Sequence, residues 1–503
     1  MTEEALFQCA MPVTLKKPLP ESPEAAFIAQ SQFGTIPIYH GSIPVSVPWR
    51  CHFSANFVPS ECLARRVKRE YTEERKLMEQ EGIEMNERLV FHVDVNSAFL
   101  SWEATRRVKN GEPDLRLIPS CIGGDPESRR GVVLAKSIPA KAFKIKTGEP
   151  IAMALRKCPQ LVIAKPDFKL YSSCSKAFKD ICRSYAPVVE EFSIDECFMD
   201  LTGTGHMYPD PVALAHTIKD RIRDELGFTV NIGIGRNKLC AKMASDFEKP
   251  DKVHTLYPEE IPDKLWPLPV GDLLFVGGAS VNRLREERIY TIGELAHTDP
   301  ELLRRILGDK MSLQARNYAN GIDNSPVRAE PEEAKGYSNS VTLEENVTTL
   351  EAADAILLAL SDSVSAHMRS DGAKAYCVAV SIRYLDFKNR SHQCKTDHPV
   401  ESTREIYELS KRLLRELWKD HRPLRLMSIA LSNLTREDEV GQMSLFGDED
   451  SGRRARDVKL DKAVDALRSK FGTNIIQRGT VMKDGLQVAR KFKGKQASEQ
   501  EKT

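Results

Sequence analysis

The sequence lacks three features that define broad classes of protein. It has no run of about 18 apolar residues, so we expect no membrane-spanning helix. Its N-terminus, MTEEALFQCAMPVTLKK, lacks the basic-then-apolar order of a secretory signal. Its eleven cysteines include no C-x-x-C pair. This argues against a disulfide framework or a zinc site and favours a reducing, cytoplasmic environment.

The chain also lacks an excess of charge of either sign. Its 503 residues include 73 Lys+Arg and 72 Asp+Glu, a net charge of +1. This balance excludes a protein that coats nucleic acid by bulk positive charge, but it does not exclude a local basic groove. A hydrophobic content of 41% is enough for a buried core. The length predicts about three or four domains.

Residues 1–84 differ from the rest of the chain. Prolines interrupt them repeatedly, and no apolar period persists for long. Met85 then opens MNERLVFHVDVNSAF, in which charged residues precede a sudden β-type run. We therefore expect residues 1–84 to be a leader or disordered extension. A small partner-binding segment is the alternative.

From Leu89 the pattern alternates between strands and helices. Ser97 is placed to cap the first helix and Gly111 to end it. The segment 113–166 reads as an insertion after that helix. Without it, the order is strand, helix, strand, strand, helix, strand, which is typical of a ferredoxin-like fold with helices on one face. The segments, in that order, are 89–95, 97–111, 188–192, 196–202, 209–227 and 228–235, and a further helix follows at 237–250.

Two further units follow along the chain. Short helices with glycine turns are expected from Leu265 to about residue 321. An α/β unit follows, with strands at 375–387 and 425–435 and helices at 349–370 and 402–420. Beyond it, a polar, acidic stretch precedes a helical segment, and the last residues are expected to be disordered.

Three acids lie at the ends of the expected strands. Asp94 ends the first strand, and Asp195 and Glu196 lie at the joint between the next two. The first and third strands of a split βαβ sheet are neighbours, so we expect the three carboxylates to meet. They would repel one another, and divalent cations relieve that repulsion, with hard oxygen ligands favouring Mg²⁺. For each acid alone, a solvated turn residue or a helix cap is the alternative.

Positive charge follows the last strand of this unit. Lys238 and Lys242 are four residues apart and share a helix face. They come after a strand-to-helix turn, Gly233–Asn237, that contains Arg236. Backbone amides at a helix start, with lysines nearby, suit phosphate groups. A tight turn with solvated lysines is the alternative.

At these residues the sequence resembles a Y-family DNA polymerase of the bacterial polymerase IV type. The resemblance covers roughly residues 88–446 and rests on VDVNSAF, FSIDECFMDL and GIGRNKLCAKMASDFEKP in that order. It implies an α+β multidomain fold with a ferredoxin-like palm, a fingers insertion, a small helical thumb and a C-terminal α/β little-finger domain. The implied bounds are 85–112 and 167–249 for the palm, 113–166 for the fingers, 250–335 for the thumb, 336–437 for the little finger and 438–503 for a clamp-binding linker and tail.

The resemblance also implies a reaction, the addition of dNTPs to a primer 3′ end by two-metal nucleotidyl transfer, with low fidelity and the ability to copy damaged DNA. It implies that Phe99 is the steric gate against ribose, although from the residues alone Phe99 reads as part of the core. Implied ligands of two Mg²⁺ ions, or of Mn²⁺, are Asp94, the Val95 carbonyl, Asp195 and Glu196. Implied nucleotide contacts are Ser97, Ala98, Phe99, Lys141 and Lys242, and implied DNA contacts are Arg236, Lys238, Gly277 and Gly278.

The fingers and the thumb depart from the family pattern. Ala135, Ile138 and Lys141 stand where the family has a threonine, a tyrosine and an arginine. Two hydroxyls are therefore absent, and a bidentate guanidinium is replaced by a point charge, which affects nucleotide selection. In the thumb, Gly277-Gly278-Ala279 replaces the usual glycine-apolar-glycine of a helix-hairpin-helix, whose amides can still bind DNA phosphate.

A second motif lies after the little finger. Gln442-Met443-Ser444-Leu445-Phe446 resembles the Q-x-S-L-F peptide that binds the bacterial sliding clamp. Gln442 would bond to the clamp backbone, while Leu445 and Phe446 would fill an apolar pocket. A chance apolar pair in a linker is the alternative.

These features together predict a monomeric bacterial enzyme of the cytoplasm. Its expected partners are primer–template DNA, dNTPs and the sliding clamp, and it has no membrane partner. Three alternatives for its function stay open on the sequence. They are a non-catalytic clamp-tethered accessory protein of the same fold, a different two-metal enzyme on the same palm, and a structural DNA-binding protein.

Overall fold

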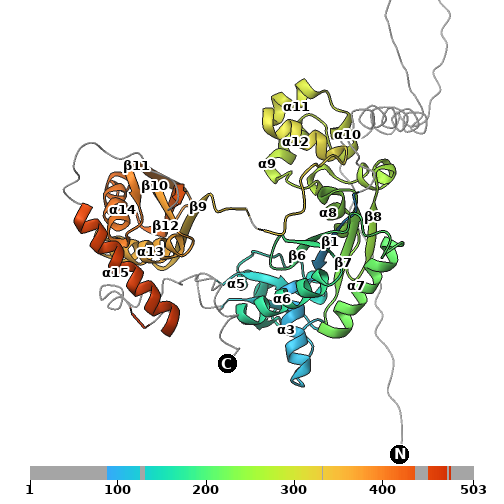
Figure 1. Ribbon diagram of the computed structural model, residues 1–503, viewed down its shortest axis with the longest axis horizontal. Helices are drawn as coiled ribbons and strands as arrows, with labels where there is room; N and C mark the ends of the chain where they lie inside the picture. The colour runs from blue at the N-terminus through green and yellow to red at the C-terminus, as the bar shows by residue number, and fades with distance from the viewer. Residues whose placement is uncertain (1–87, 125–130, 331, 437–450, 473–474, 477–503) are drawn as a thin grey trace, which may run out of the picture. The chain divides into compact units, whose positions relative to one another are not determined.

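The computed structural model describes residues 88–124, 131–330, 332–436, 451–472 and 475–476 (Figure 1). The expected leader at 1–84 and the segment Gln442–Phe446 lie outside these residues. In the described part of the chain, no helix is long and apolar enough to cross a membrane. The described strands form three sheets flanked by helices, which confirms the predicted α+β class.

The first sheet has the strand order β5-β6-β1-β7-β8. β1 (Val90–Val95) pairs antiparallel with β6 (Glu196–Asp200) on one side and with β7 (Val230–Gly235) on the other. β5 (Val188–Glu191) and β8 (Val253–Leu256) form the edges. All six residues of β1 are buried, because the strand is central and both sheet faces are covered. The expectation that the first and third strands, β1 and β6, are neighbours in the sheet is confirmed.

One face of this sheet is covered by α6 (Phe168–Arg183) and α7 (Pro211–Leu226). α3 (Ala98–Lys109), which follows β1, packs into the same core. The sequence reading did not include α6. Polar residues are frequent in it, but its buried positions, which include Tyr171 and Phe178, repeat at helical spacing.

The opposite face of the sheet is covered by α8 (Lys238–Asp246), so the prediction of helices on one face only is wrong. Two glycines of β7 explain how closely the backbone of α8 approaches this strand. A Cβ atom at Gly233 would lie 2.0 Å from the Ala241 carbonyl oxygen, and one at Gly235 would lie 2.7 Å from the Ala241 nitrogen. Both glycines are strand residues that admit the helix backbone. They do not form the turn that the sequence indicated.

The insertion after α3 forms a small sheet of its own. Its strands are β2 (Ser120–Gly123), β3 (Val133–Lys136) and β4 (Val162–Ala164), in the order β3-β2-β4. Two short helices, α4 (Ile138–Ala142) and α5 (Ile151–Lys157), share a separate core with these strands. The Ser137 hydroxyl accepts a hydrogen bond from the Ala140 amide and so caps α4.

Short helices follow β8, as the sequence predicted. Three single-turn helices span Pro258–Glu260, Ile261–Leu265 and Val270–Asp272. Four α-helices then follow: α9 (Gly278–Glu286), α10 (Ile292–His297), α11 (Pro300–Leu307) and α12 (Asp309–Ala319).

The C-terminal unit is a four-stranded antiparallel sheet in the order β11-β10-β12-β9, and α13 and α14 share its core. The predicted strands and helices are all present, but β9 and β11 were missed. β11 is a polar edge strand with mostly exposed side chains, so it has little apolar signal. The elements are β9 (Gly336–Val347), α13 (Leu350–Ser370), β10 (Ala373–Tyr384), β11 (Asn389–Val400), α14 (Thr403–Leu417) and β12 (Leu424–Arg436), followed by α15 (Ser451–Phe471).

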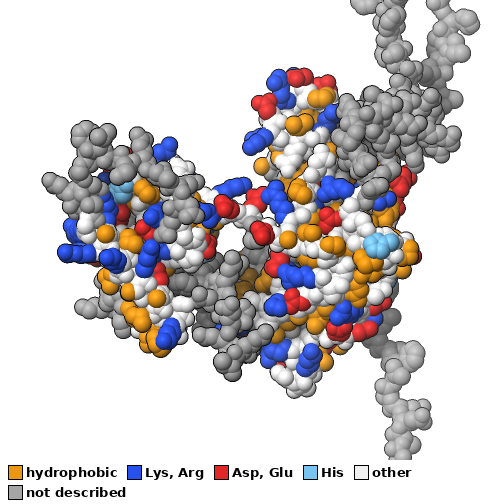
Figure 2. All heavy atoms as spheres, viewed as in Figure 1, with side chains coloured by type: hydrophobic (Ala, Val, Ile, Leu, Met, Phe, Trp, Pro, Cys, Tyr) orange, Lys and Arg blue, Asp and Glu red, His pale blue; other side chains and the backbone are white. Residues whose placement is uncertain are grey.

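Charges of both signs are interspersed on the face of the molecule in Figure 2, as the near-zero net charge implies. No large surface of a single sign is visible there. Recognition of a charged ligand therefore depends on local arrangements of side chains.

Candidate active site

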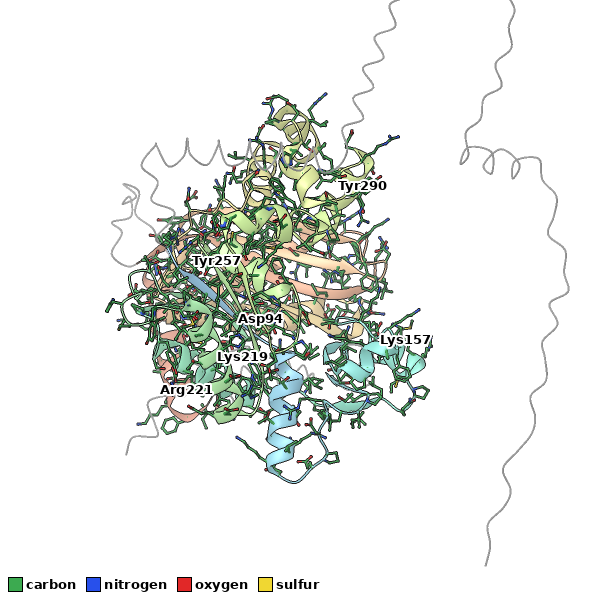
Figure 3. The ribbon with its side chains drawn as sticks, turned by 90° about the vertical axis from the view of Figure 1, so that its right-hand side faces the viewer. Asp94, Lys157, Lys219, Arg221, Tyr257 and Tyr290 are labelled. Carbon is green, nitrogen blue, oxygen red and sulfur yellow. The ribbon has the colours of Figure 1, made fainter. Side chains whose placement is uncertain are left out.

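The pairing of β1 with β6 brings two of the three predicted acids together. Asp94 is the register partner of Glu196, so both side chains lie on the sheet face that α8 covers. Figure 3 labels Asp94 where β1 approaches α3. Asp94 is only 7% exposed, and burial raises the pKa of its carboxyl although two lysines oppose the effect. The carboxylates of Asp94 and Glu196 repel each other at this separation, so positively charged side chains are needed beside them.

Two lysines supply that positive charge. Lys242 Nζ donates to Glu196 Oε1 at 2.9 Å and lies 3.5 Å from Asp94 Oδ2. Lys249 Nζ donates to the same Asp94 oxygen at 2.6 Å. Burial would lower the pKa of both ammonium groups, but the facing carboxylates outweigh it and raise the pKa. Both lysines therefore stay charged, and each holds its ammonium against an acid.

A buried histidine also contacts this group. His92 Nε2 lies 3.5 Å from Glu196 Oε2, and burial lowers the pKa of the imidazole. The Ser245 hydroxyl donates to the Lys242 carbonyl, and its Oγ lies 2.8 Å from His92 Nδ1. Burial would raise the pKa of Glu196, but contact with His92 and the charge of Lys242 hold it at about 2. Glu196 is therefore ionised at neutral pH.

The third predicted acid is oriented differently. The Asp195 carbonyl accepts a hydrogen bond from the Val95 amide at 3.0 Å, which places its backbone beside the end of β1. Its carboxylate, however, accepts a hydrogen bond from Ser193 Oγ at 2.6 Å. Among the described residues, no group of three or more His, Cys, Asp or Glu side chains is arranged to hold a metal ion. The expectation that all three carboxylates converge is therefore not met in this arrangement.

The donors at this sheet edge nevertheless have the chemistry that a hard divalent cation requires. Asp94, Asp195 and Glu196 offer carboxylate oxygens, and the Val95 carbonyl belongs to the same strand end. No cysteine ligand competes, because Cys197 faces the opposite core. A three-acid site would need the Asp195 side chain to turn away from Ser193. It would also need the Lys242 and Lys249 ammonium groups to leave the oxygens of Glu196 and Asp94.

The turn between β1 and α3 leads directly to Phe99, the second residue of that helix. Ser97 occupies the position before the helix with φ 49°, and its side chain makes no capping bond, so its predicted role as a cap is wrong. Ser97 is exposed, whereas Ala98 is buried. Phe99 is half-buried and stacks on Tyr171 of α6 at 4.7 Å between ring centroids, with an interplanar angle of 15°.

Both predicted basic DNA contacts have partners within the protein. Lys238 Nζ donates to Glu190 Oε1 at 2.6 Å, and Arg236 lies over the Tyr257 ring at 5.0 Å. The alternative in the sequence reading, a solvated lysine, does not hold for Lys238, because its ammonium group is paired with Glu190. These two cations hold the end of β7 and the start of α8 in place.

The remaining predicted contacts lie in other units. Lys141 is exposed on α4. Gly277 precedes α9 and Gly278 begins it, and a Cβ atom at either glycine would meet nothing within 4 Å. Neither glycine has a positive φ, so the fold does not require glycine there. Gln442, Leu445 and Phe446 lie outside the described residues.

Sequence reasoning missed three side chains that contact the site, namely Lys249, His92 and Tyr171. The loop that carries Lys249 is fixed by the Asp251 amide, which donates to Asn96 Oδ1 at 2.9 Å. His92 alternates with Asp94 along β1, so strand periodicity could have placed it on the same face. Tyr171 could have been found from the helical spacing of the apolar residues in α6, but the sequence reading did not include that helix.

Comparison with known families assigns this fold and site to a class. The chain matches the impB/mucB/samB family over residues 93–246 and the C-terminal domain of that family over residues 334–445. A Y-family DNA polymerase chimera of Dbh and Dpo4 has the same fold, with a TM-score of 0.62 at 22% identity, and the match covers 69% of this chain and 100% of the chimera. The chain therefore belongs to the impB/mucB/samB family of Y-family DNA polymerases.

Relatives within the family are considerably more similar. A DNA polymerase IV of Clostridium acetobutylicum is 44% identical over 398 residues, which are 78% of this chain and 98% of the relative. DNA polymerase IV 1 of Bacillus subtilis is 34% identical over 400 residues, which are 79% of this chain and 94% of the relative. The chain is a DNA-directed DNA polymerase, and its substrates are primer–template DNA and dNTPs.

Proposed function

We propose that this polymerase copies damaged templates by two-metal nucleotidyl transfer in the bacterial cytoplasm, as a monomer. The observation that carries the proposal is the pair Asp94 and Glu196 on neighbouring strands, with Lys242 and Lys249 against them. A partly buried pair of acids that share their charge with two ammonium groups is suited to a site whose charge changes when a substrate binds.

Asp94, Asp195, Glu196 and the Val95 carbonyl would hold the metal ions, with Mg²⁺ as the expected metal. When bound, two such ions stabilise the attacking and leaving oxygens of an in-line displacement. The protein groups position the reactants. β1 and β6 hold the acids at one sheet edge, and His92 and Ser245 fix the Glu196 and Lys242 side of that edge.

Lys242 and Lys249 would bind the triphosphate of the incoming nucleotide. Each now neutralises a carboxylate that would otherwise ligate metal. Metal binding would release these ammonium groups toward the phosphate oxygens. Lys141 of the insertion adds a point charge without the bidentate geometry of an arginine. With Ala135 and Ile138 beside it, few hydroxyl contacts hold the nucleotide, so selection of the correct base should be weak.

The test of catalysis is primer extension with Mg²⁺ and dNTPs. Asp195→Ala and Glu196→Ala should each lower the rate at least about 100-fold, because each removes a group that stabilises charge in the transition state. Asp224→Ala is the matched control, since that acid is 67% exposed on α7 and paired only with its neighbour Arg223. Primer extension by both acid variants at the rate of the unmodified enzyme would refute the site assignment. Bypass is tested separately, by extension across a defined template lesion.

Phe99 would act as the steric gate against ribonucleotides. Phe99 is the second residue of α3, just after the strand that carries Asp94, and its ring stacks on Tyr171. A ring face under the sugar leaves no room for a 2′-hydroxyl, and Ser97 and Ala98 line the approach. Phe99→Ala should admit ribonucleotides. Unchanged discrimination between dCTP and CTP would refute this role.

The amides at Gly277 and Gly278 would bind DNA phosphate, since both residues are exposed at the start of α9. Arg236 and Lys238 would contribute less than the sequence indicated, because their charges are already engaged. The DNA affinity of the enzyme should therefore be modest and salt-dependent.

Gln442, Leu445 and Phe446 would bind the sliding clamp. The match of this peptide to the clamp-binding pattern supports the assignment, and tethering would offset weak contact with DNA. Leu445→Ala with Phe446→Ala should abolish stimulation of extension by the clamp and leave extension without the clamp intact. Stimulation equal to that of the unmodified chain would contradict the assignment.

A further inference from the structure

The C-terminal helix α15 packs on its unit through charged side chains. Arg369 of α13 donates to Asp465 at 2.8 Å and lies 3.6 Å from Asp461. Arg468 pairs with Asp362 of α13 at 2.9 Å, and both side chains are nearly fully buried. These ion pairs fix which side of α15 faces the sheet unit, because a buried charge tolerates few alternative partners.

The same orientation leaves the apolar residues of α15 toward solvent. Leu460 is 59% exposed, Leu467 43% and Phe471 58%. They are spaced by seven and four residues and therefore share one face, together with Val464. Hydrophobic side chains reach the surface in this region in Figure 2. We call Leu460, Val464, Leu467 and Phe471 the α15 stripe.

The burial pattern of α15 is the reverse of that of an ordinary surface helix. α14, by contrast, buries Ile406, Leu413 and Leu414 against the sheet. An aligned apolar face that stays exposed, while charged residues are buried, indicates a surface kept for a partner.

We propose that the α15 stripe is a second contact with the sliding clamp, adjacent to the peptide Gln442–Phe446. This inference rests on the proposed clamp binding of that peptide. Four residues separate Phe446 from Ser451, a reach of about 18 Å even when fully extended. Leu460 lies about 14 Å further along the helix. A clamp that binds the peptide Gln442–Phe446 is therefore close enough to contact the α15 stripe as well.

The charge beside the stripe defines the chemistry of the partner surface. Arg453 and Arg456 precede Leu460 by seven and four residues, so they extend the same face toward the peptide. The complementary surface is therefore an apolar patch edged by carboxylates. The peptide would supply the anchor, and the stripe would fix the orientation of the polymerase on the clamp.

The test measures the affinity of the full chain for the purified sliding clamp of the same bacterium. Leu460→Ser with Leu467→Ser should raise Kd about tenfold at an unchanged melting temperature, because both side chains are exposed in the free protein. Ala466→Ser is the matched control, since it changes an exposed residue on another face of α15 and should leave Kd unchanged. Leu445→Ala with Phe446→Ala is measured in parallel.

Each outcome decides between the two clamp contacts. If the peptide variant loses affinity and the stripe variant does not, the stripe proposal is wrong and the peptide assignment stands. If neither change weakens binding, both are wrong. If the stripe variant changes only self-association in sedimentation, the stripe binds a second copy of the chain, and the clamp proposal is overturned.

Discussion

The ammonium group of Lys249 shares one Asp94 oxygen with a second lysine, Lys242. This contact joins residues 155 positions apart, so no local motif indicates it. Asp246 also pairs with both lysines, so three carboxylates share two ammonium groups before any substrate arrives. At the scale of single residues, the charge balance around the two acids therefore depends on cations that the sequence reading only half identified.

Replacement of Lys249 by alanine should raise the KM for dNTPs about tenfold or more. The physical reason is the loss of a charge-assisted hydrogen bond to the triphosphate, which contributes about 1.5–3 kcal/mol. Steady-state primer extension measures the effect. Lys252→Ala is the control, because that lysine is 49% exposed and contacts only Glu248. An unchanged KM would show that Lys249 serves only to balance Asp94.

The stacked pair of Phe99 and Tyr171 predicts that Tyr171 positions the gate. Tyr171→Leu should raise incorporation of CTP relative to dCTP about tenfold, because Phe99 loses the ring that holds it. Tyr171→Phe keeps the ring and should keep the discrimination. The ratio of kcat/KM for the two nucleotides is the readout. A general loss of activity with an unchanged ratio would indicate a role in folding alone.

At the scale of elements, the contact between β7 and α8 sets the position of the lysines. Gly233 and Gly235 let the helix backbone touch the strand, and the helix then directs Lys242 at the acids. In the sequence these glycines resemble a phosphate-binding turn. A glycine can be needed because a neighbouring backbone comes close or because the residue has a positive φ, and the sequence does not tell these two reasons apart.

Gly233→Ala should destabilise the protein by about 1–3 kcal/mol or more, since its Cβ atom would overlap the Ala241 carbonyl. Urea unfolding monitored by circular dichroism measures the shift. Gly205→Ala is the control, because a Cβ atom there meets nothing within 4 Å, and it should change stability by less than about 0.5 kcal/mol. Equal stability of the two variants would mean that α8 moves away from β7 at little cost.

At the scale of the whole molecule, the family match begins at residue 93, and the Clostridium acetobutylicum relative aligns over 98% of its own length with 78% of this chain. A chain that starts at Met85 should therefore extend primers as fast as the full chain. Specific activity and solubility of the two chains are the measurements. A large loss of either would assign residues 1–84 a necessary role and contradict the expectation that they are a leader.

The sequence by itself determined the class, the core strands and the identity of the acids. A short, valine-rich run such as VFHVDV favours a buried strand, and ordered motifs identify a family before any contact is known. The tertiary structure decided the rest: which acids face each other, that Asp195 turns to Ser193, and that Lys249, His92 and Tyr171 complete the site. It also decided that α15 buries its charges and exposes its apolar stripe. These arrangements depend on contacts between residues that are far apart in the sequence, and the local spacing of residues does not encode such contacts.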